Sequence, residues 1–244
     1  NPIGSQNTAV GSSAGTSITT GDYNVAMGVD TLSTLSTGDN NTALGKGALA
    51  AATTSDDNTA VGYNALAANT TGTQNVAVGT LALDASTTAS YNTAMGYAAM
   101  GANTSGTYNT GLGSGALLVN TTGSSNTSVG MNSMDANTTG GSNTAVGTSA
   151  LGANTTASNN TAVGTSALLY NTTGTQNVAV GAASLDANTT ASENTAVGWN
   201  SLSTNTTGAS NVAVGKSALS ANTTAANNTA VGVSALEANT TGTR

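Results

Sequence analysis

Few residues in this chain could support catalysis. It has no His and no Cys, and its basic residues are Lys46, Lys216 and Arg244. Ser and Thr nucleophiles need an activating base, and none of the usual kind accompanies them. Asp56 and Asp57 are the one adjacent carboxylate pair that a glycosidase could use, but neighbours on a strand point to opposite faces. We therefore expect no catalytic residue and no enzyme, and interpret Asp56–Asp57 as a solvated turn.

Four acidic residues recur at a spacing that raises the question of a metal column. Asp84, Asp135, Asp186 and Glu237 are each 51 residues from the next, three times a 17-residue repeat that runs through the chain. Three stacked coils would separate them by about 14 Å, whereas Ca²⁺ needs oxygens at about 2.3–2.6 Å. We expect no metal and no cofactor, and interpret the spacing as duplication of blocks of repeats.

Asn-Thr-Thr and Asn-Thr-Ser triplets are the sharpest chemical signal. They are N-glycosylation acceptors if they face outward and meet a glycosylating machinery. The alternative is a stacked Asn ladder, with the triplet a by-product of repetition. The candidate acceptors are Asn69, Asn103, Asn120, Asn137, Asn154, Asn171, Asn188, Asn205, Asn222 and Asn239.

The repeat itself organises the whole chain. Fourteen copies of 17 residues run without insertion or deletion over residues 7–244, after a short lead-in at residues 1–6. A period held this strictly indicates a solenoid whose coils lie in register, rather than a disordered low-complexity tract. Each copy opens with Asn, at Asn7, Asn24, Asn41, Asn58, Asn75, Asn92, Asn109, Asn126, Asn143, Asn160, Asn177, Asn194, Asn211 and Asn228.

The pattern inside one repeat predicts two short strands. Positions are numbered 1 to 17 from the opening Asn. Positions 1–5, typically "NTAVG", alternate with period two, and so does the stretch from position 8 to 14, "ALxANTT". Gly at position 5 and Gly or Ala at position 15 predict turns. A helix is disfavoured because Asn, Thr and Gly recur too often.

We therefore expect an all-β fold, a β-solenoid or β-roll with one 17-residue coil per turn. Strands about 4.8 Å apart would make a rod of roughly 67 Å. The opening Asn residues would stack as an amide ladder. Apolar columns are expected at positions 2, 4, 9 and 11, which in one copy are Thr59, Val61, Leu66 and Ala68. This core is thin, so we expect a flank to be buried against copies of the chain.

Composition excludes several partners. Charged residues make up 5% of the chain and the net charge is −7. Nucleic acids and anionic membrane surfaces require clustered Lys and Arg, so neither is expected as a partner. No apolar run approaches the ~20 residues of a membrane-spanning helix.

Two binding functions need exposed arrays. A glycan platform would use aromatic residues, but Trp199 and the six tyrosines are scattered along the chain, at Tyr23, Tyr63, Tyr91, Tyr97, Tyr108 and Tyr170. Ice binding would need a flat Thr array. The Thr columns at positions 13 and 14 are adjacent and would face opposite sides, which disfavours it.

The repeat resembles known fibre arrays. Residues 58–74, "NTAVGYNALAANTTGTQ", and 160–176, "NTAVGTSALLYNTTGTQ", are similar to the "NTAVGxxALxxNTTGxx" arrays of phage tail-fibre shafts. They resemble more distantly the shorter repeats of trimeric autotransporter adhesin heads. The resemblance covers residues 7–244 and implies a homotrimeric fibre on a virion or cell surface.

These observations predict a structural protein, an extracellular or virion fibre or filament shaft built by self-association. The alternative is an adhesin head that binds a surface glycan or receptor through a repeated flank. The last repeat is as regular as the others, so we expect either a segment of a longer fibre or ends that stack head to tail into a filament.

Overall fold

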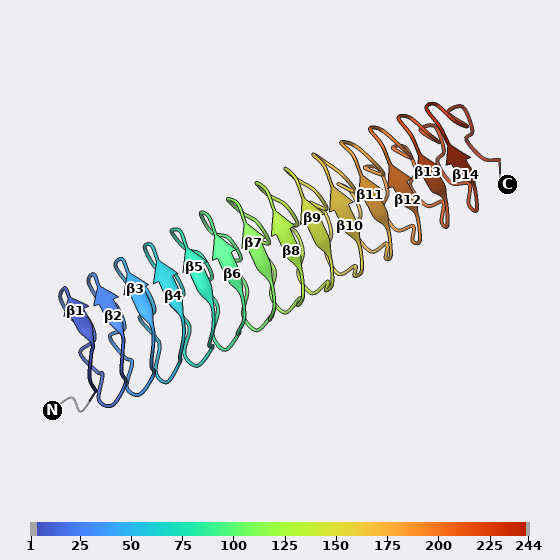
Figure 1. Ribbon diagram of the computed structural model, residues 1–244. Coiled ribbons are helices and arrows are strands. Elements are labelled where there is room, and N and C mark those ends of the chain that lie inside the picture. The colour runs from blue at the N-terminus through green and yellow to red at the C-terminus, as the bar shows by residue number, and fades with distance from the viewer. Residues whose placement is uncertain (1–3, 243–244) are drawn as a thin grey trace. The chain divides into compact units, whose positions relative to one another are not determined.

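The computed structural model describes residues 4–242, and its regular structure is entirely β. The chain forms two compact units, Asn1–Thr122 and Gly123–Arg244, and each is described by itself. The first unit holds β1 (Thr8–Val10), β2 (Val25–Met27), β3 (Thr42–Leu44), β4 (Thr59–Val61), β5 (Val76–Val78), β6 (Thr93–Met95) and β7 (Thr110–Leu112) (Figure 1). The second holds β8 (Thr127–Val129), β9 (Thr144–Val146), β10 (Thr161–Val163), β11 (Val178–Val180), β12 (Thr195–Val197), β13 (Val212–Val214) and β14 (Thr229–Val231).

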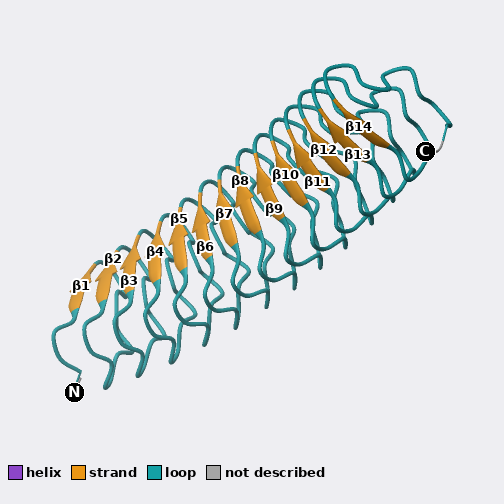
Figure 2. Ribbon diagram, turned by 45° about the vertical axis from the view of Figure 1, so that its right-hand side comes forward, coloured by secondary structure: helices purple, strands orange, loops and turns teal. Residues whose placement is uncertain are grey.

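Within each unit, every strand pairs in parallel with the strand one repeat along the chain. In the first unit Ala60 lies opposite Ala77, and in the second Ala162 lies opposite Ala179. Each pair is offset by one full repeat, so equivalent residues form columns. The predicted fold class is confirmed, because each unit is a β-solenoid with one 17-residue coil per turn. The strands occupy one side of the coils and loops the remainder (Figure 2).

The second predicted strand of the repeat does not form. Residues 65–71 are turns and bends in the structure, and Leu66 in their middle has φ of 52°. A left-handed residue reverses the local chain direction and ends any extended run. Position 9 has positive φ in every described coil, as do positions 7 and 17. The sequence does not predict these turns, because most of the residues at these positions are not Gly.

The strand also faces the opposite way from the prediction. Ala60 at position 3 is fully buried, whereas Thr59 and Val61 point outward and are only half-buried. Of the four residues predicted to line the core, Leu66 does so, while Thr59, Val61 and Ala68 do not. Alternation defines two faces of a strand but does not say which face is inside.

The narrow interior explains this inversion. A Cβ added at Gly111, which replaces the position 3 Ala, would lie 3.2 Å from Cγ of Met100 at position 9 of the preceding coil. Position 3 therefore packs directly against the large position 9 side chain, and only a small residue fits there. The coil that follows the larger Met100 carries Gly instead of Ala.

The two Thr columns take different roles. The Thr70 hydroxyl, at position 13, donates to the carbonyl oxygen of Thr87 in the next coil at 3.0 Å. Thr71, at position 14, is exposed. No helix among residues 4–242 is long and apolar enough to cross a membrane.

Candidate functional site

The opening Asn of each repeat belongs to a hydrogen-bonded column within each unit. In the first unit the backbone N–H of each Asn from Asn24 to Asn109 donates to Oδ1 of the Asn one coil earlier, at 2.8–3.1 Å. In the second unit the same bonds run from Asn143 to Asn228 at 2.9–3.0 Å. The column therefore fixes the register between coils.

The same side chain also closes its own coil. Nδ2 of Asn58 donates to the carbonyl oxygen of Gly72, fourteen residues later, at 2.9 Å. In the second unit Asn177 donates in the same way to Ala191 at 2.9 Å. Only Asn supplies an acceptor for the next coil and a donor for this carbonyl at this length, because Asp lacks the donor. This dual role explains why position 1 is Asn in all fourteen copies.

The Asn residues of the Asn-Thr-Thr triplets form a second buried column. Nδ2 of Asn69 donates to the same Gly72 carbonyl oxygen at 2.9 Å. In the second unit Asn154, Asn171, Asn188, Asn205, Asn222 and Asn239 each donate to Oδ1 of the Asn one coil earlier, at 2.8–3.2 Å. The two Asn columns therefore meet at the position 15 carbonyl of each such coil.

This geometry argues against the glycosylation hypothesis at nine of the ten candidates. The side chains of Asn69, Asn103, Asn120, Asn137, Asn154, Asn171, Asn188, Asn205 and Asn222 have no exposed surface. A glycan on Nδ2 would replace a donated hydrogen and has no room inside the coil. Asn239, in the last coil, is half-buried. The triplet is explained instead by the ladder at position 12 followed by the two Thr columns.

One interruption of the second column leaves unpaired groups. Ser86 occupies position 12 in the coil between Asn69 and Asn103. Its hydroxyl and the Oδ1 of Asn69 are buried and have no hydrogen-bond partner. Serine is too short to reach the neighbouring coils at this position. In this column the bond between coils therefore forms only where adjacent coils both carry Asn.

The acidic residues at position 10 lie apart from one another. Burial raises the pKa of Asp84, Asp135 and Asp186, and bonds from the backbone N–H groups of each Asp and the next residue partly offset that rise. A Cβ at Gly101 would lie 3.3 Å from Oδ1 of Asp84, so Gly in the following coil leaves room for the carboxyl group. Residues 4–242 contain no group of three or more His, Cys, Asp or Glu that could hold a metal ion.

Asp56 has carboxylate neighbours that the sequence analysis overlooked. Its Oδ1 accepts the backbone N–H of Asp39 at 2.8 Å, and Oδ1 of Asp39 accepts the backbone N–H of Asp22 at 2.7 Å. Three acids at position 16 of consecutive coils are therefore stacked and half-buried, while Asp57 is exposed. The 17-residue spacing of these three acids in the sequence could have indicated that they are stacked. Because these oxygens bind backbone N–H groups, the column acts as part of the ladder.

Two contacts of aromatic rings join neighbouring coils. The rings of Tyr91 and Tyr108 are stacked with centroids 4.9 Å apart, and Nζ of Lys216 lies 5.4 Å from the centre of the Trp199 ring. Each stacked ring covers a face that a sugar would need. Tyr63, Tyr97 and Tyr170 are exposed in separate coils. This arrangement does not create a continuous glycan platform.

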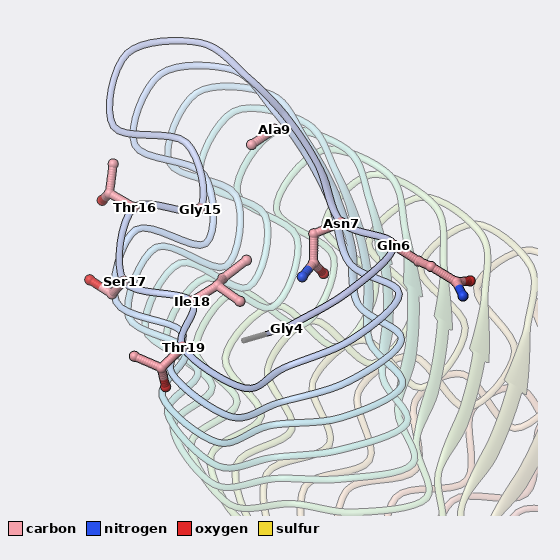
Figure 3. Close-up of a pocket in the computed structure, with 9 residues that line it drawn as sticks. All are labelled: Gly4, Gln6, Asn7, Ala9, Gly15, Thr16, Ser17, Ile18 and Thr19. Carbon is pink, nitrogen blue, oxygen red and sulfur yellow. The ribbon is translucent and has the colours of Figure 1, made fainter. Parts of the chain in front are cut away.

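A cavity of about 510 Å³ lies at the N-terminal end of the first unit (Figure 3). Ala9, Gly15 and Ile18 line it, and its other lining residues carry no ionisable side chain. Ala9 is exposed, whereas the equivalent Ala26 in the next coil is fully buried. The cavity is thus the uncovered interior of the first described coil.

Searches against models of protein families, curated proteins and solved structures found no match.

Proposed function

We propose that this chain is a structural protein, a shaft segment of an extracellular or virion fibre that associates with copies of itself. The supporting observation is the pair of Asn columns, which bond each coil to its own end and to the coil before it. The most strongly constrained side chains of the repeat thus serve coil stacking. Such columns supply stiffness and a constant rise per repeat, which are the properties that a shaft needs.

The remaining chemistry supports the same proposal. The stacked acids, the Thr70 hydroxyl and the Asn side chains all bind backbone groups of neighbouring coils. The proposal includes no enzyme activity and no cofactor. The partners proposed are copies of the chain, side by side or head to tail, on a virion or cell surface.

Deletion of whole repeats tests the shaft proposal. Removing the three repeats at residues 160–210 should leave a folded protein and shorten the particle by about 14 Å. Electron cryomicroscopy would measure the length, and circular dichroism would measure the β content. The matched control removes residues 160–206, four fewer, which leaves four surplus residues between two coils and should lower the melting temperature below that of the three-repeat deletion. A particle whose length does not change with whole repeats would contradict the proposal.

A further inference from the structure

The outward side of the sheet carries a regular array of side chains from positions 2 and 4, here called the outer face. In the second unit every residue of this array is β-branched. Position 2 contributes Thr127, Thr144, Thr161, Val178, Thr195, Val212 and Thr229, and position 4 contributes Val129, Val146, Val163, Val180, Val197, Val214 and Val231. β-branched residues have few rotamers, so this surface is ordered before it meets any partner.

Exposed apolar surface is concentrated on and beside this face. Among the described residues, twelve of the eighteen exposed large apolar side chains lie at position 4 or position 6. Position 6 follows the Gly that ends the strand, and its exposed members include Tyr97, Met131 and Trp199. A concentration of exposed apolar side chains on one side of a protein favours an interaction surface there.

Carboxylates are excluded from the same columns, although Lys46 and Lys216 lie at position 6. None of the ten acidic residues of the chain lies at position 2, 4 or 6. They occupy positions 7, 10, 16 and 17. In a chain of net charge −7 this distribution leaves one side on which two copies can approach without carboxylates meeting.

The area of the face suits a second copy. Seven strands at about 4.8 Å and three residues at about 3.3 Å give roughly 330 Å² in each unit, or about 670 Å² for the two units together. A standard interface buries about 800 Å² per partner. The position 6 column enlarges the area of the outer face. The area that a second copy could cover is therefore close to that of a standard interface.

We propose that the outer face binds the outer face of a second copy of this chain. This inference rests on the self-association in the proposed function and names its surface. Two sheets packed face to face lie about 10 Å apart, with their β-branched side chains interdigitated. Because one flat face is covered by one opposing face, the contact is pairwise and self-complementary. This contact joins two chains, whereas the resemblance implies three.

Charged substitutions on the face provide the test. The variant Val163→Glu with Val180→Glu places four carboxylates in the paired interface, two from each chain. The matched control Thr173→Glu with Thr156→Glu changes two exposed position 14 residues of the same unit. Sedimentation equilibrium should show dimers for the wild type and the control, and at least a hundredfold weaker association for the face variant. Circular dichroism confirms that each variant is folded.

A lysine variant of the same face distinguishes loss of the contact from loss of folding. A mixture of the Glu variant with Val163→Lys, Val180→Lys should form mixed dimers, although neither variant associates alone. If the face variant still forms dimers as the wild type does, the outer face is not the contact surface, although the chain does associate with itself. Monomeric wild-type protein would overturn both, whereas the shaft geometry is tested separately by the repeat deletions. Trimers of the wild type would overturn the pairwise contact.

Discussion

At the scale of single residues, the solenoid depends on amides that each satisfy several backbone groups. Asn160 shows this best, because its Oδ1 accepts the N–H of Asn177 and its Nδ2 donates to the carbonyl of Gly174. Both bonds are buried, so losing either leaves an unpaired group inside the coil. The Asn side chains therefore stabilise the fold in a way that their polarity alone would not suggest.

Replacing Asn160 with Asp should destabilise the chain strongly. The carboxylate would face the Gly174 carbonyl without a proton to donate, and it would be buried as a charge. We expect the free energy of unfolding to fall by about 3 kcal/mol, with part of the loss recovered at acidic pH. The control is Asn159→Asp, because Asn159 is exposed with φ of 63°, which Asp tolerates. Equal losses in urea denaturation would contradict the ladder argument.

Completing the second Asn column should stabilise the first unit. In Ser86→Asn the new amide can donate to the orphaned Oδ1 of Asn69 and accept from Nδ2 of Asn103. We expect a gain of about 1–2 kcal/mol in the free energy of unfolding, measured on protein made in a bacterial host without N-glycosylation. Ser86→Ala serves as the control, since it removes an unpaired hydroxyl without adding a bond. A gain no greater than that of the control would refute the prediction.

The position 10 acids should make the chain more stable in acid. Burial raises the folded-state pKa of Asp84, Asp135 and Asp186 above the ordinary value of 3.8. The folded chain then holds protons that the unfolded chain releases, so stability falls as the pH rises through the window just above 3.8. The triple Asp→Asn variant should exceed the wild type in melting temperature at about pH 7 but lose that advantage at about pH 3. An advantage independent of pH would contradict this mechanism.

At the scale of one coil, the turns depend on left-handed backbone at fixed positions. Gly164, at position 5, has φ of 134°, and a Cβ there would lie 2.6 Å from the backbone carbon of Gly181. Leu168, at position 9, holds φ of 54° although its side chain is large. The neighbouring coils impose this conformation on Leu, because burial of its side chain outweighs the local strain.

Gly164→Ala should therefore unfold the second unit more readily. Both the dihedral angle and the backbone contact oppose a side chain, so we expect a loss of about 3 kcal/mol or more. Gly152→Ala is the matched control, because its nearest contact is the movable Cδ1 of Leu169 at 3.1 Å and its φ is not positive. Thermal unfolding of the two variants measures the difference. Comparable melting temperatures would show that the turn is not restrictive.

At the scale of the whole molecule, each of the two units is an array in which a coil pairs with the coils next to it. Such arrays fold as coupled repeats rather than around one central core. The fragment of residues 126–244, which contains seven complete repeats, should therefore fold by itself. We expect β-type circular dichroism and a cooperative urea transition. A fragment that stays unfolded, while the complete chain folds under the same conditions, would contradict a local array.

The predictions of a solenoid and of stacked residues depend mainly on the exact period of the repeat. A 17-residue repeat without insertions indicates coils of constant length, because coils that stack in register cannot gain or lose residues freely. The period also placed the opening Asn residues in one column. It could have revealed the stacked Asp22, Asp39 and Asp56, which are one repeat apart.

Periodicity and composition alone predict the coil length, the all-β class and which residues are stacked. Packing between the coils sets which side of each strand faces the interior. Alternation is symmetric between the two faces. The narrow space between position 3 and position 9, measured at Gly111 and Met100, admits only a small residue, so Ala60 is buried and Val61 is not. The structure likewise decided that the Asn-Thr-Thr amides are buried, since residues eleven apart in the repeat, Asn58 and Asn69, converge on one carbonyl. Convergence of this kind depends on turns at non-Gly residues, which local sequence preferences do not reveal.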